Sequence, residues 1–165
     1  MIHVELEVRE RACRRLREAL GAQGGRVILI HPGSGSPRKN WPGACFAALI
    51  SELRSAGYDV ALIEGEADRA AVGGLQATLE PATAPVLQNL CLLDLAGALA
   101  EACLFVGNDS GVTHLAASLD RPVVCLFGPT DPSIWAPVCA RAQVLEMSSS
   151  PDRVFSAALE VLERG

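Results

Sequence analysis

Two loops carry the residues whose types and spacing could bind a phosphate group. The first, residues 31–42, reads HPGSGSPRKNWP, and its small residues leave backbone amides free for an anion. It contains Lys39, the only lysine in the chain, just before a predicted helix. An ammonium group placed there could neutralise a phosphate. A solvated Arg-Lys pair on a tight turn fits the same residues, and the spacing does not decide between the two. The GxxxxGK(S/T) pattern of a Walker A loop is absent.

The second loop, residues 107–114 (GNDSGVTH), links an apolar run directly to a predicted helix. Asp109 or Ser110 can cap this helix, and the first N–H groups lie at the positive end of its dipole. Gly111 has no side chain to keep a ligand away from the backbone. This arrangement suits a diphosphate, and the alternative is an ordinary capped helix with His114 packed one turn in. The candidates for phosphate contact in this loop are the N–H groups of Ser110, Gly111 and Val112.

Two further loops could complete a nucleotide-sugar site. Residues 64–68 (EGEAD) place three acids after an apolar run, where nucleotide-binding α/β domains often hold an acid that accepts hydrogen bonds from a ribose. Glu66 and Asp68 are the candidates, although acids also favour the start of a helix. Residues 128–132 (GPTDP) form a rigid polar loop that could shape a sugar pocket or serve only as a turn.

Other site chemistries find little support. Neither Ser34 nor Ser110 lies in a GxSxG pattern, which argues against a nucleophilic serine. The GxGxxG fingerprint of dinucleotide binding is absent too. The cysteines have no CxxC or zinc-ligand spacing and stand beside apolar residues, so we expect unpaired thiols in the core. They are Cys13, Cys45, Cys91, Cys103, Cys125 and Cys139.

The elements that must position these loops alternate along the chain. Apolar spacing predicts helices over residues 4–20, 42–57, 67–79, 93–102 and 111–119, and from residue 150 onward. Short apolar runs predict strands over residues 27–30, 59–63, 86–87, 103–106, 123–127 and 143–146, with a Pro-rich loop over 128–137. This alternation predicts an α/β fold, a Rossmann-like doubly wound parallel sheet in which ligands bind at the carboxyl ends of the strands.

Composition bounds the class of protein. The 165 residues suffice for one α/β domain, and the net charge of −5 argues against a partner that is nucleic acid or an anionic membrane. Hydrophobic residues make up 50% of the chain, which suggests strands buried on both faces or a face for a partner. The sequence has no apolar run long enough to cross a bilayer, and its start lacks the pattern of a signal peptide. These features predict a cytosolic single domain.

The two loop motifs resemble a known enzyme family. HPGSGSPRKNWP, GNDSGVTHLAASLDRPVVCLFGPTDP and the WAP that follows resemble the carboxy-terminal half of glycosyltransferase family 9, the ADP-heptose:lipopolysaccharide heptosyltransferases and their relatives, which have a GT-B fold. The likeness covers residues 26–147. It implies a nucleotide-sugar-binding Rossmann-like domain over residues 26–165, with a helix and linker over residues 1–25 leading into it.

The resemblance also implies an activity and a set of contacts. The activity is inverting transfer of a sugar, typically heptose from ADP-heptose, to a growing lipopolysaccharide core. Lys39, Asp109, Ser110, Gly111, Val112 and His114 would hold the donor phosphates. Ala67 occupies the usual place of the acid that binds ribose or base, so Glu66 or Asp68 would substitute for it. Ser34, Gly35, Thr130 and Asp131 would line the rim near the transferred sugar and the acceptor.

The family's mechanism divides the work between two domains. Lys39 and the amides after Asp109 would stabilise the leaving diphosphate, so no metal cofactor is expected, and no DxD motif is present to hold one. The catalytic base and most of the acceptor site belong to an amino-terminal domain, which we expect to be absent from 165 residues. The chain alone would then contain no catalytic residue, bind nucleotide diphosphates weakly and transfer little sugar.

The expected partners follow from this division. They are a nucleotide-sugar donor and, through the amino-terminal domain, a lipopolysaccharide-core acceptor, with no nucleic acid and no transmembrane segment. The expected location is cytoplasmic, and peripheral association of the full-length protein with the inner face of the inner membrane stays open. Two alternatives remain: a stand-alone nucleotide-diphosphate-sugar-binding or regulatory module without catalysis, and a scaffold whose exposed sheet or helix edge recruits a partner.

Overall fold

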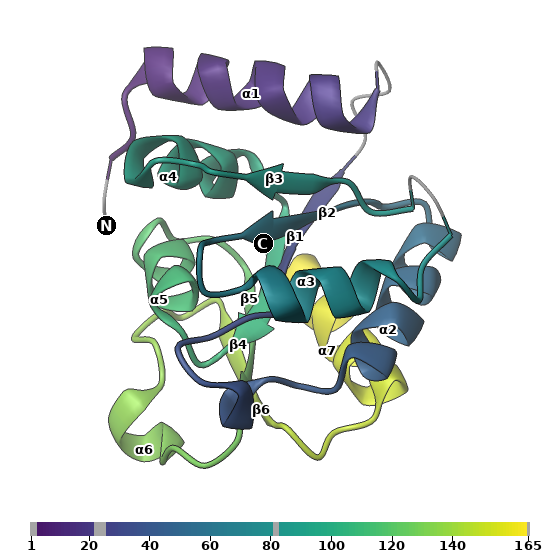
Figure 1. Ribbon diagram of the computed structural model, residues 1–165. Helices are drawn as coiled ribbons and strands as arrows, with labels where there is room; N and C mark the ends of the chain where they lie inside the picture. Colours follow the sequence, from purple (N-terminus) through teal and green to yellow (C-terminus); the bar gives the residue numbers. More distant parts are fainter. Residues whose placement is uncertain (1–2, 22–25, 81–82, 165) are drawn as a thin grey trace.

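The parallel sheet is the centre of the molecule (Figure 1). The computed structural model describes residues 3–21, 26–80 and 83–164. Six parallel strands pair in the order β3-β2-β1-β4-β5-β6, which is the order of Rossmann-fold domains and confirms the predicted fold. Their bounds are β1 (Val27–His31), β2 (Asp59–Glu64), β3 (Val86–Gln88), β4 (Leu104–Asn108), β5 (Val123–Phe127) and β6 (Ala142–Glu146).

Helices cover both faces of this sheet. The bounds are α1 (Leu6–Leu20), α2 (Gly43–Ser55), α3 (Arg69–Gln76), α4 (Leu92–Glu101), α5 (Gly111–Ser118), α6 (Pro132–Trp135) and α7 (Pro151–Glu163). Alternate strand residues point to opposite faces, so Ile28 and Ile30 pack with α2, α3 and α7. Leu29, between them, packs with α1, α4 and α5. Burial on both faces explains why the strands read as continuous apolar runs.

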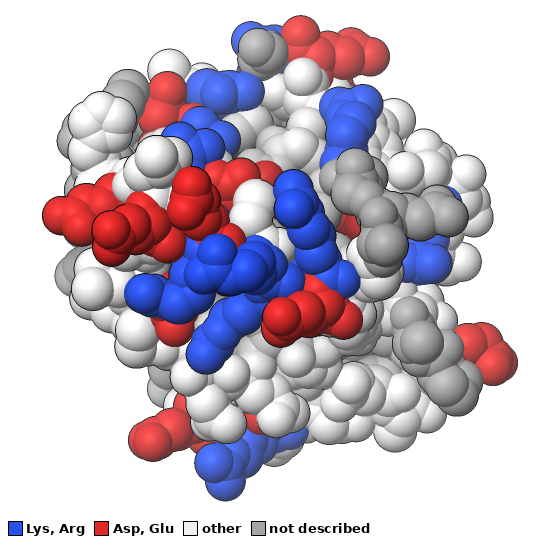
Figure 2. Space-filling model, turned by 90° about the horizontal axis from the view of Figure 1, so that it is seen from above, with Lys and Arg blue, Asp and Glu red and all other residues white. Residues whose placement is uncertain are grey.

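Helix α1 forms an outer layer on α4 (Figure 1). Its buried stripe is Val8, Ala12 and Leu16. The two helices approach closely at Gly97, where an added Cβ would lie 2.9 Å from the Cβ of Ala12. Figure 2 shows the molecule from this side, where basic side chains gather between acidic ones. The arginines of α1 contribute ion pairs to α4 here, since Arg9 pairs with Glu101, and Arg11 and Arg15 with Asp94.

Several details differ from the sequence-based expectation. A 3-10 helix, η1 (Pro37–Lys39), and helix α6 lie inside segments predicted as loops. Helix α3 ends at Gln76 because tighter turns follow it, in which the Thr78 N–H and hydroxyl both donate to the Leu75 carbonyl. All six cysteines are unpaired, as expected, but the prediction that all are core thiols is wrong, because only Cys125 is fully buried and Cys91 is exposed. Within the described ranges, every helix is too short or too polar to span a membrane.

Candidate functional site

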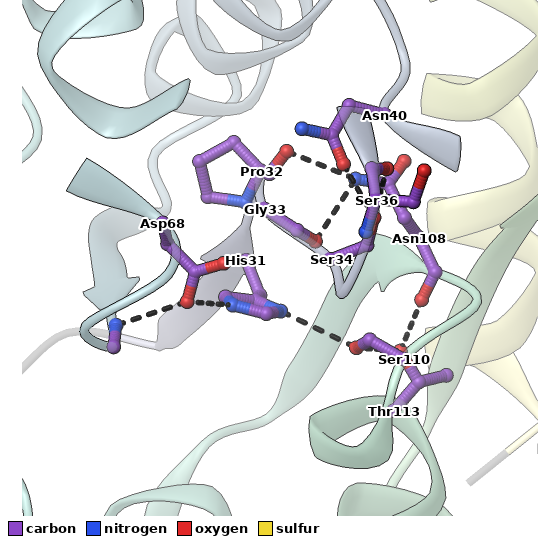
Figure 3. A network of polar contacts seen from close by, with 11 residues as sticks. His31, Pro32, Gly33, Ser34, Ser36, Asn40, Asp68, Asn108, Ser110 and Thr113 are labelled. Atoms are coloured by element: carbon purple, nitrogen blue, oxygen red, sulfur yellow. Dashed lines mark hydrogen bonds and ion pairs between the residues drawn. The ribbon is translucent and has the colours of Figure 1, made fainter. Parts of the chain in front are cut away.

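The central strands β1 and β4 bring the two motif loops together at their carboxyl ends. His31 at the end of β1 lies beside Gly107 in the register of the pair, and Asn108 follows as the last residue of β4. The fully buried Asn108 side chain ties the loops together (Figure 3). Its Oδ1 accepts from the Trp41 N–H at 2.9 Å, and its Nδ2 donates to the carbonyls of Pro32 at 2.9 Å and Gly33 at 3.2 Å.

The first loop presents Lys39 to the start of α5. Helix η1 positions this lysine, and the Ser34 hydroxyl stabilises the turn before it through contacts with the Ser36 carbonyl at 2.7 Å and Asn40 Oδ1 at 2.6 Å. Lys39 Nζ donates to Asp109 Oδ2 at 2.7 Å, directly before α5. The predicted proximity of the lysine and this helix is therefore confirmed.

The Asp109 carboxylate lies beside three side chains that were predicted as site residues from three separate loops. Besides Lys39, the Thr130 hydroxyl donates to Asp109 Oδ2 at 2.8 Å. His114 Nε2 lies 3.9 Å from the other carboxylate oxygen. The Asp109 side chain is buried, while that of Lys39 keeps 29% of its surface exposed, so the ammonium group can reach a ligand without leaving the carboxylate. Lysine has three N–H donors, which makes this double contact possible.

The start of α5 carries no side-chain cap. Ser110 is the N-cap residue, but neither its hydroxyl nor the Asp109 carboxylate accepts from a backbone N–H of the first turn, so the capping prediction is wrong. The Ser110 hydroxyl contacts only the side chain of Thr113 there, at 3.3 Å. Both groups contact side chains from other parts of the fold. The Asp109 carboxylate accepts from Lys39 and Thr130, and Ser110 Oγ contacts His31 Nδ1 at 3.3 Å. The first N–H groups of a helix have no intrahelical partner, so they are available to an anion.

A buried His-Asp pair lies behind the same loops (Figure 3). His31 Nε2 lies 2.8 Å from Asp68 Oδ2, which also accepts from the Gly65 N–H at 3.0 Å. The hydrogen bond with His31 lowers the pKa of Asp68, and it outweighs the burial that would raise it. Gly33 leaves no room for a side chain here, since an added Cβ would lie 1.9 Å from Asp68 Oδ1. His31 was not among the site residues predicted from the sequence.

An open cavity of about 420 Å³ lies beside the start of α5. It is lined by polar residues from the motif loops and by apolar residues from α4 and α5. The lining residues are His31, Ser34, Gly35, Ala67, Asp68, Leu92, Leu95, Ser110, Gly111, Val112 and Leu115. The three leucines belong to no local motif, so they could not be selected from the sequence.

Two of the predicted site residues lie apart from these groups. Glu66 is exposed and does not line the cavity. Asp131 is exposed as well, and its carboxylate accepts from the Ser133 N–H at 2.9 Å to cap α6. Hydrogen bonds from the side chain and then the backbone of Ser133 lower the pKa of Asp131. The described part of the chain contains no group of three or more His, Cys, Asp or Glu side chains that could hold a metal ion.

Comparison with known proteins assigns the chain to a family. A sequence model described as glycosyltransferase family 9 (heptosyltransferase) matches residues 2–160. The chain belongs to this family. The chain is 35% identical over 133 residues to lipopolysaccharide heptosyltransferase 2 of Salmonella typhimurium, a match that covers 78% of this chain and 38% of that enzyme. The predicted family is confirmed, and its members are glycosyltransferases.

Solved structures of this family share the fold. The E. coli ADP-heptose lipopolysaccharide heptosyltransferase II superposes with a TM-score of 0.88 at 26% identity, over 99% of this chain and 54% of that chain. The E. coli heptosyltransferase WaaC with ADP gives a TM-score of 0.71 at 26% identity, over 91% and 48% of the two chains. This family 9 chain therefore matches between 38% and 54% of the length of these relatives.

Proposed function

We propose that this family 9 chain forms the donor-binding domain of an inverting glycosyltransferase. Its ligand would be a nucleotide diphosphate sugar, and its family points to ADP-heptose as donor and the lipopolysaccharide core as acceptor. The observation that carries this proposal is the contact of 2.7 Å between Lys39 Nζ and Asp109, which places the only lysine at the uncapped start of α5. A relative in this family has been solved with ADP, which supports the choice of nucleotide.

The electrostatics at the start of α5 favour a diphosphate. The dipole of a helix contributes a partial positive charge at its N-terminus, and the amides of Gly111 and Val112 point in that direction. Lys39 adds a full positive charge, part of which Asp109 offsets. The Thr130 hydroxyl also donates to the Asp109 carboxylate, so Lys39 is not the only hydrogen-bond donor to that carboxylate. We expect modest affinity for the nucleotide, because the ammonium group serves two anions at once.

The neighbouring cavity has the size and lining expected for the nucleoside part of the donor. Its volume of about 420 Å³ lies within the usual range of small-molecule sites. We assign the base to the apolar side, between Leu92, Leu95 and Leu115. The polar side, with Ser34 and Asp68, is assigned to the sugar groups.

Of the two candidates for the ribose contact, Glu66 and Asp68, we assign the contact to Asp68. Its carboxylate lines the cavity, and Oδ1 is the oxygen that is not engaged with His31 and Gly65. Glu66 is exposed outside the cavity lining, so we expect a smaller effect from its replacement. For the transferred sugar, Thr130 remains a rim candidate through its bond to Asp109, whereas the Asp131 carboxylate caps α6.

The chemical role of this domain would be to stabilise the leaving diphosphate. Glycosyl transfer develops negative charge on the departing phosphate, and fixed N–H donors together with an ammonium group stabilise that charge without reorganisation. Lys39 and the first turn of α5 would supply those donors, and no step in this role requires a metal ion. We therefore expect nucleotide binding to persist in the presence of EDTA.

The acceptor and the catalytic base are expected from outside the residues described here. A base must lie within hydrogen-bond reach of the acceptor hydroxyl, and the carboxylates of this site are already paired, Asp109 with Lys39 and Asp68 with His31. The 165-residue chain is then expected to bind ADP but to transfer little heptose. Rapid transfer from ADP-heptose to a lipopolysaccharide acceptor by this chain alone would contradict that division of labour.

Calorimetric titration with ADP tests the proposed binding site. Lys39→Ala is expected to weaken ADP binding about ten- to hundredfold, because a hydrogen bond to a charged group contributes about 1.5–3 kcal/mol. Arg38→Ala is the matched control: it removes an adjacent, exposed cation that forms no ion pair within the described residues. We expect its affinity to stay within about twofold of the parent protein. Absence of ADP binding to the parent protein, or equal losses in both variants, would refute the proposal.

A further inference from the structure

His31 links the Asp68 carboxylate to the hydroxyl at the start of α5. The ring is 3% exposed and both of its nitrogens are engaged, Nε2 with Asp68 Oδ2 at 2.8 Å and Nδ1 with Ser110 Oγ at 3.3 Å. Each of the three side chains comes from a different part of the fold: the end of β1, the turn before α3, and the N-cap of α5. Figure 3 shows them in one line, from Asp68 through His31 to Ser110.

The protonation state of His31 determines what the Ser110 hydroxyl can offer a ligand. In neutral His31 the Nε2–H donates to Asp68, so Nδ1 accepts the proton of the Ser110 hydroxyl. The serine oxygen can then present only lone pairs to the cavity. In the imidazolium form both ring nitrogens donate, so Ser110 Oγ accepts from Nδ1 and its own proton is released from His31. That proton can then turn to Thr113 Oγ1, 3.3 Å away, or to a ligand. A phosphate oxygen requires this second state, because it accepts hydrogen bonds and does not donate them.

We propose that His31 is a positioning residue for the donor diphosphate, and that nucleotide binding draws a proton onto it so that Ser110 can donate to a phosphate oxygen. This inference rests on the proposed function, because it assumes that the diphosphate lies beside Ser110 at the start of α5. In this step one proton from solvent binds Nδ1 of His31, and no covalent bond between heavy atoms forms or breaks. The hydroxyl proton of Ser110 then turns from His31 toward the ligand.

The surroundings of His31 suit this role. The titratable and charged groups on the elements around it are Glu64 and Glu66 after β2, Asp68 before α3, Lys39 in η1, and Asp109 and His114 at α5. Of these, Asp68 contacts the ring directly, whereas Lys39 and His114 each lie beside Asp109. The carboxylate of Asp68 is buried, accepts a second bond from Gly65 and has a lowered pKa, so it remains an anion that stabilises an imidazolium.

A purely structural role makes a different prediction. If His31 only tied β1 to the turn before α3, its replacement would lower stability or affinity by the same factor at every pH. The coupling proposed here makes the effect of the replacement depend on pH between about 5 and 8, where an imidazole changes charge. The terminal phosphate of ADP titrates in both proteins, so the comparison between the parent and a variant isolates the contribution of His31.

Calorimetric titration of the protein with ADP at pH values between 8 and 6, in two buffers of different ionisation enthalpy, tests the proposed proton uptake. His31→Gln keeps a donor for Asp68 but cannot titrate. We expect the parent protein to take up as much as one more proton than this variant on binding ADP. The ratio of the variant's Kd to that of the parent should rise about three- to tenfold as the pH falls across this range. Equal proton uptake and a ratio independent of pH would overturn the inference.

Two further variants complete the test. Ser110→Ala leaves the pair of His31 and Asp68 intact, so it must also lose the extra proton uptake; if the uptake persists, His31 does not act through Ser110. His31→Asn retains an amide donor near the position of Nδ1, and it should bind ADP more tightly than His31→Gln at pH 8. Thermal unfolding of each variant identifies those that fold. Failure of the parent to bind ADP would refute the proposed function itself, which is a separate outcome.

Discussion

Replacement of Asn108 by alanine should destabilise the protein strongly, because the side chain is the link between β4 and the first motif loop. Asn108 is fully buried, and its amide forms hydrogen bonds with the backbone of Pro32, Gly33 and Trp41. Leaving a buried backbone group without a partner costs about 1–3 kcal/mol. Three such groups, with partial relaxation of the loop, give an expected loss of about 3–5 kcal/mol in the free energy of unfolding. That corresponds to a fall in Tm of about 10 °C or more for a domain of this size.

Urea denaturation followed by circular dichroism measures this loss. Gln88→Ala is the control, because Gln88 is an exposed strand residue whose replacement should change stability by less than about 0.5 kcal/mol. Under conditions in which Asn108→Ala remains folded, ADP should also bind more weakly, since Lys39 lies in the loop that has lost its anchor. A loss of stability below about 1 kcal/mol would refute the reasoning, since it would mean that water or neighbouring groups satisfy all three backbone partners.

Three further predictions concern packing and pH. Gly97→Ala should loosen α1, since its Cβ would lie 2.9 Å from that of Ala12; unchanged hydrogen-exchange protection of α1 would contradict the close packing. Gly33→Ala should displace the Asp68 carboxylate from His31, because the new Cβ would lie 1.9 Å from Oδ1; weaker ADP binding is expected, and parent-like affinity would contradict the assigned site. The lowered pKa of Asp68 means that its ionised form stabilises the fold above about pH 4 and that this contribution is lost as the pH falls toward the folded-state pKa. The stability advantage of the parent over Asp68→Asn, measured by urea denaturation, should therefore shrink below about pH 4, and an advantage that grows there would be the wrong sign.

The regular part of the fold could be predicted because local signals and tertiary structure agree. Strands β4 and β5 are buried along their whole length, so their continuous apolar runs identify them without further information. The inner face of α2 (Phe46, Leu49, Ile50 and Leu53) has helical spacing and is buried as predicted. Helices η1 and α6 were not predicted, because elements of three or four residues are too short to show an apolar period.

The site was only partly predictable, because many of its contacts join residues that are far apart in the sequence. The predicted position of the site follows from the rule that ligands bind at the carboxyl ends of parallel strands, and the only lysine of the chain lies, as expected, beside the start of α5. His31 and Asn108 owe their importance to partners between 37 and 79 residues away, which no local pattern reveals. The capping prediction for Asp109 was wrong for the same reason, because Lys39 and Thr130 compete successfully with the local backbone.

The most direct test of the account is a crystal structure of the protein with ADP. We predict that oxygens of the diphosphate lie at about 3 Å from the backbone nitrogens of Gly111 and Val112 and from Lys39 Nζ, with the adenosine in the cavity beside Leu92. Binding of ADP elsewhere would contradict the account, for example in the groove between Phe127 and Ser148 at the ends of β5 and β6.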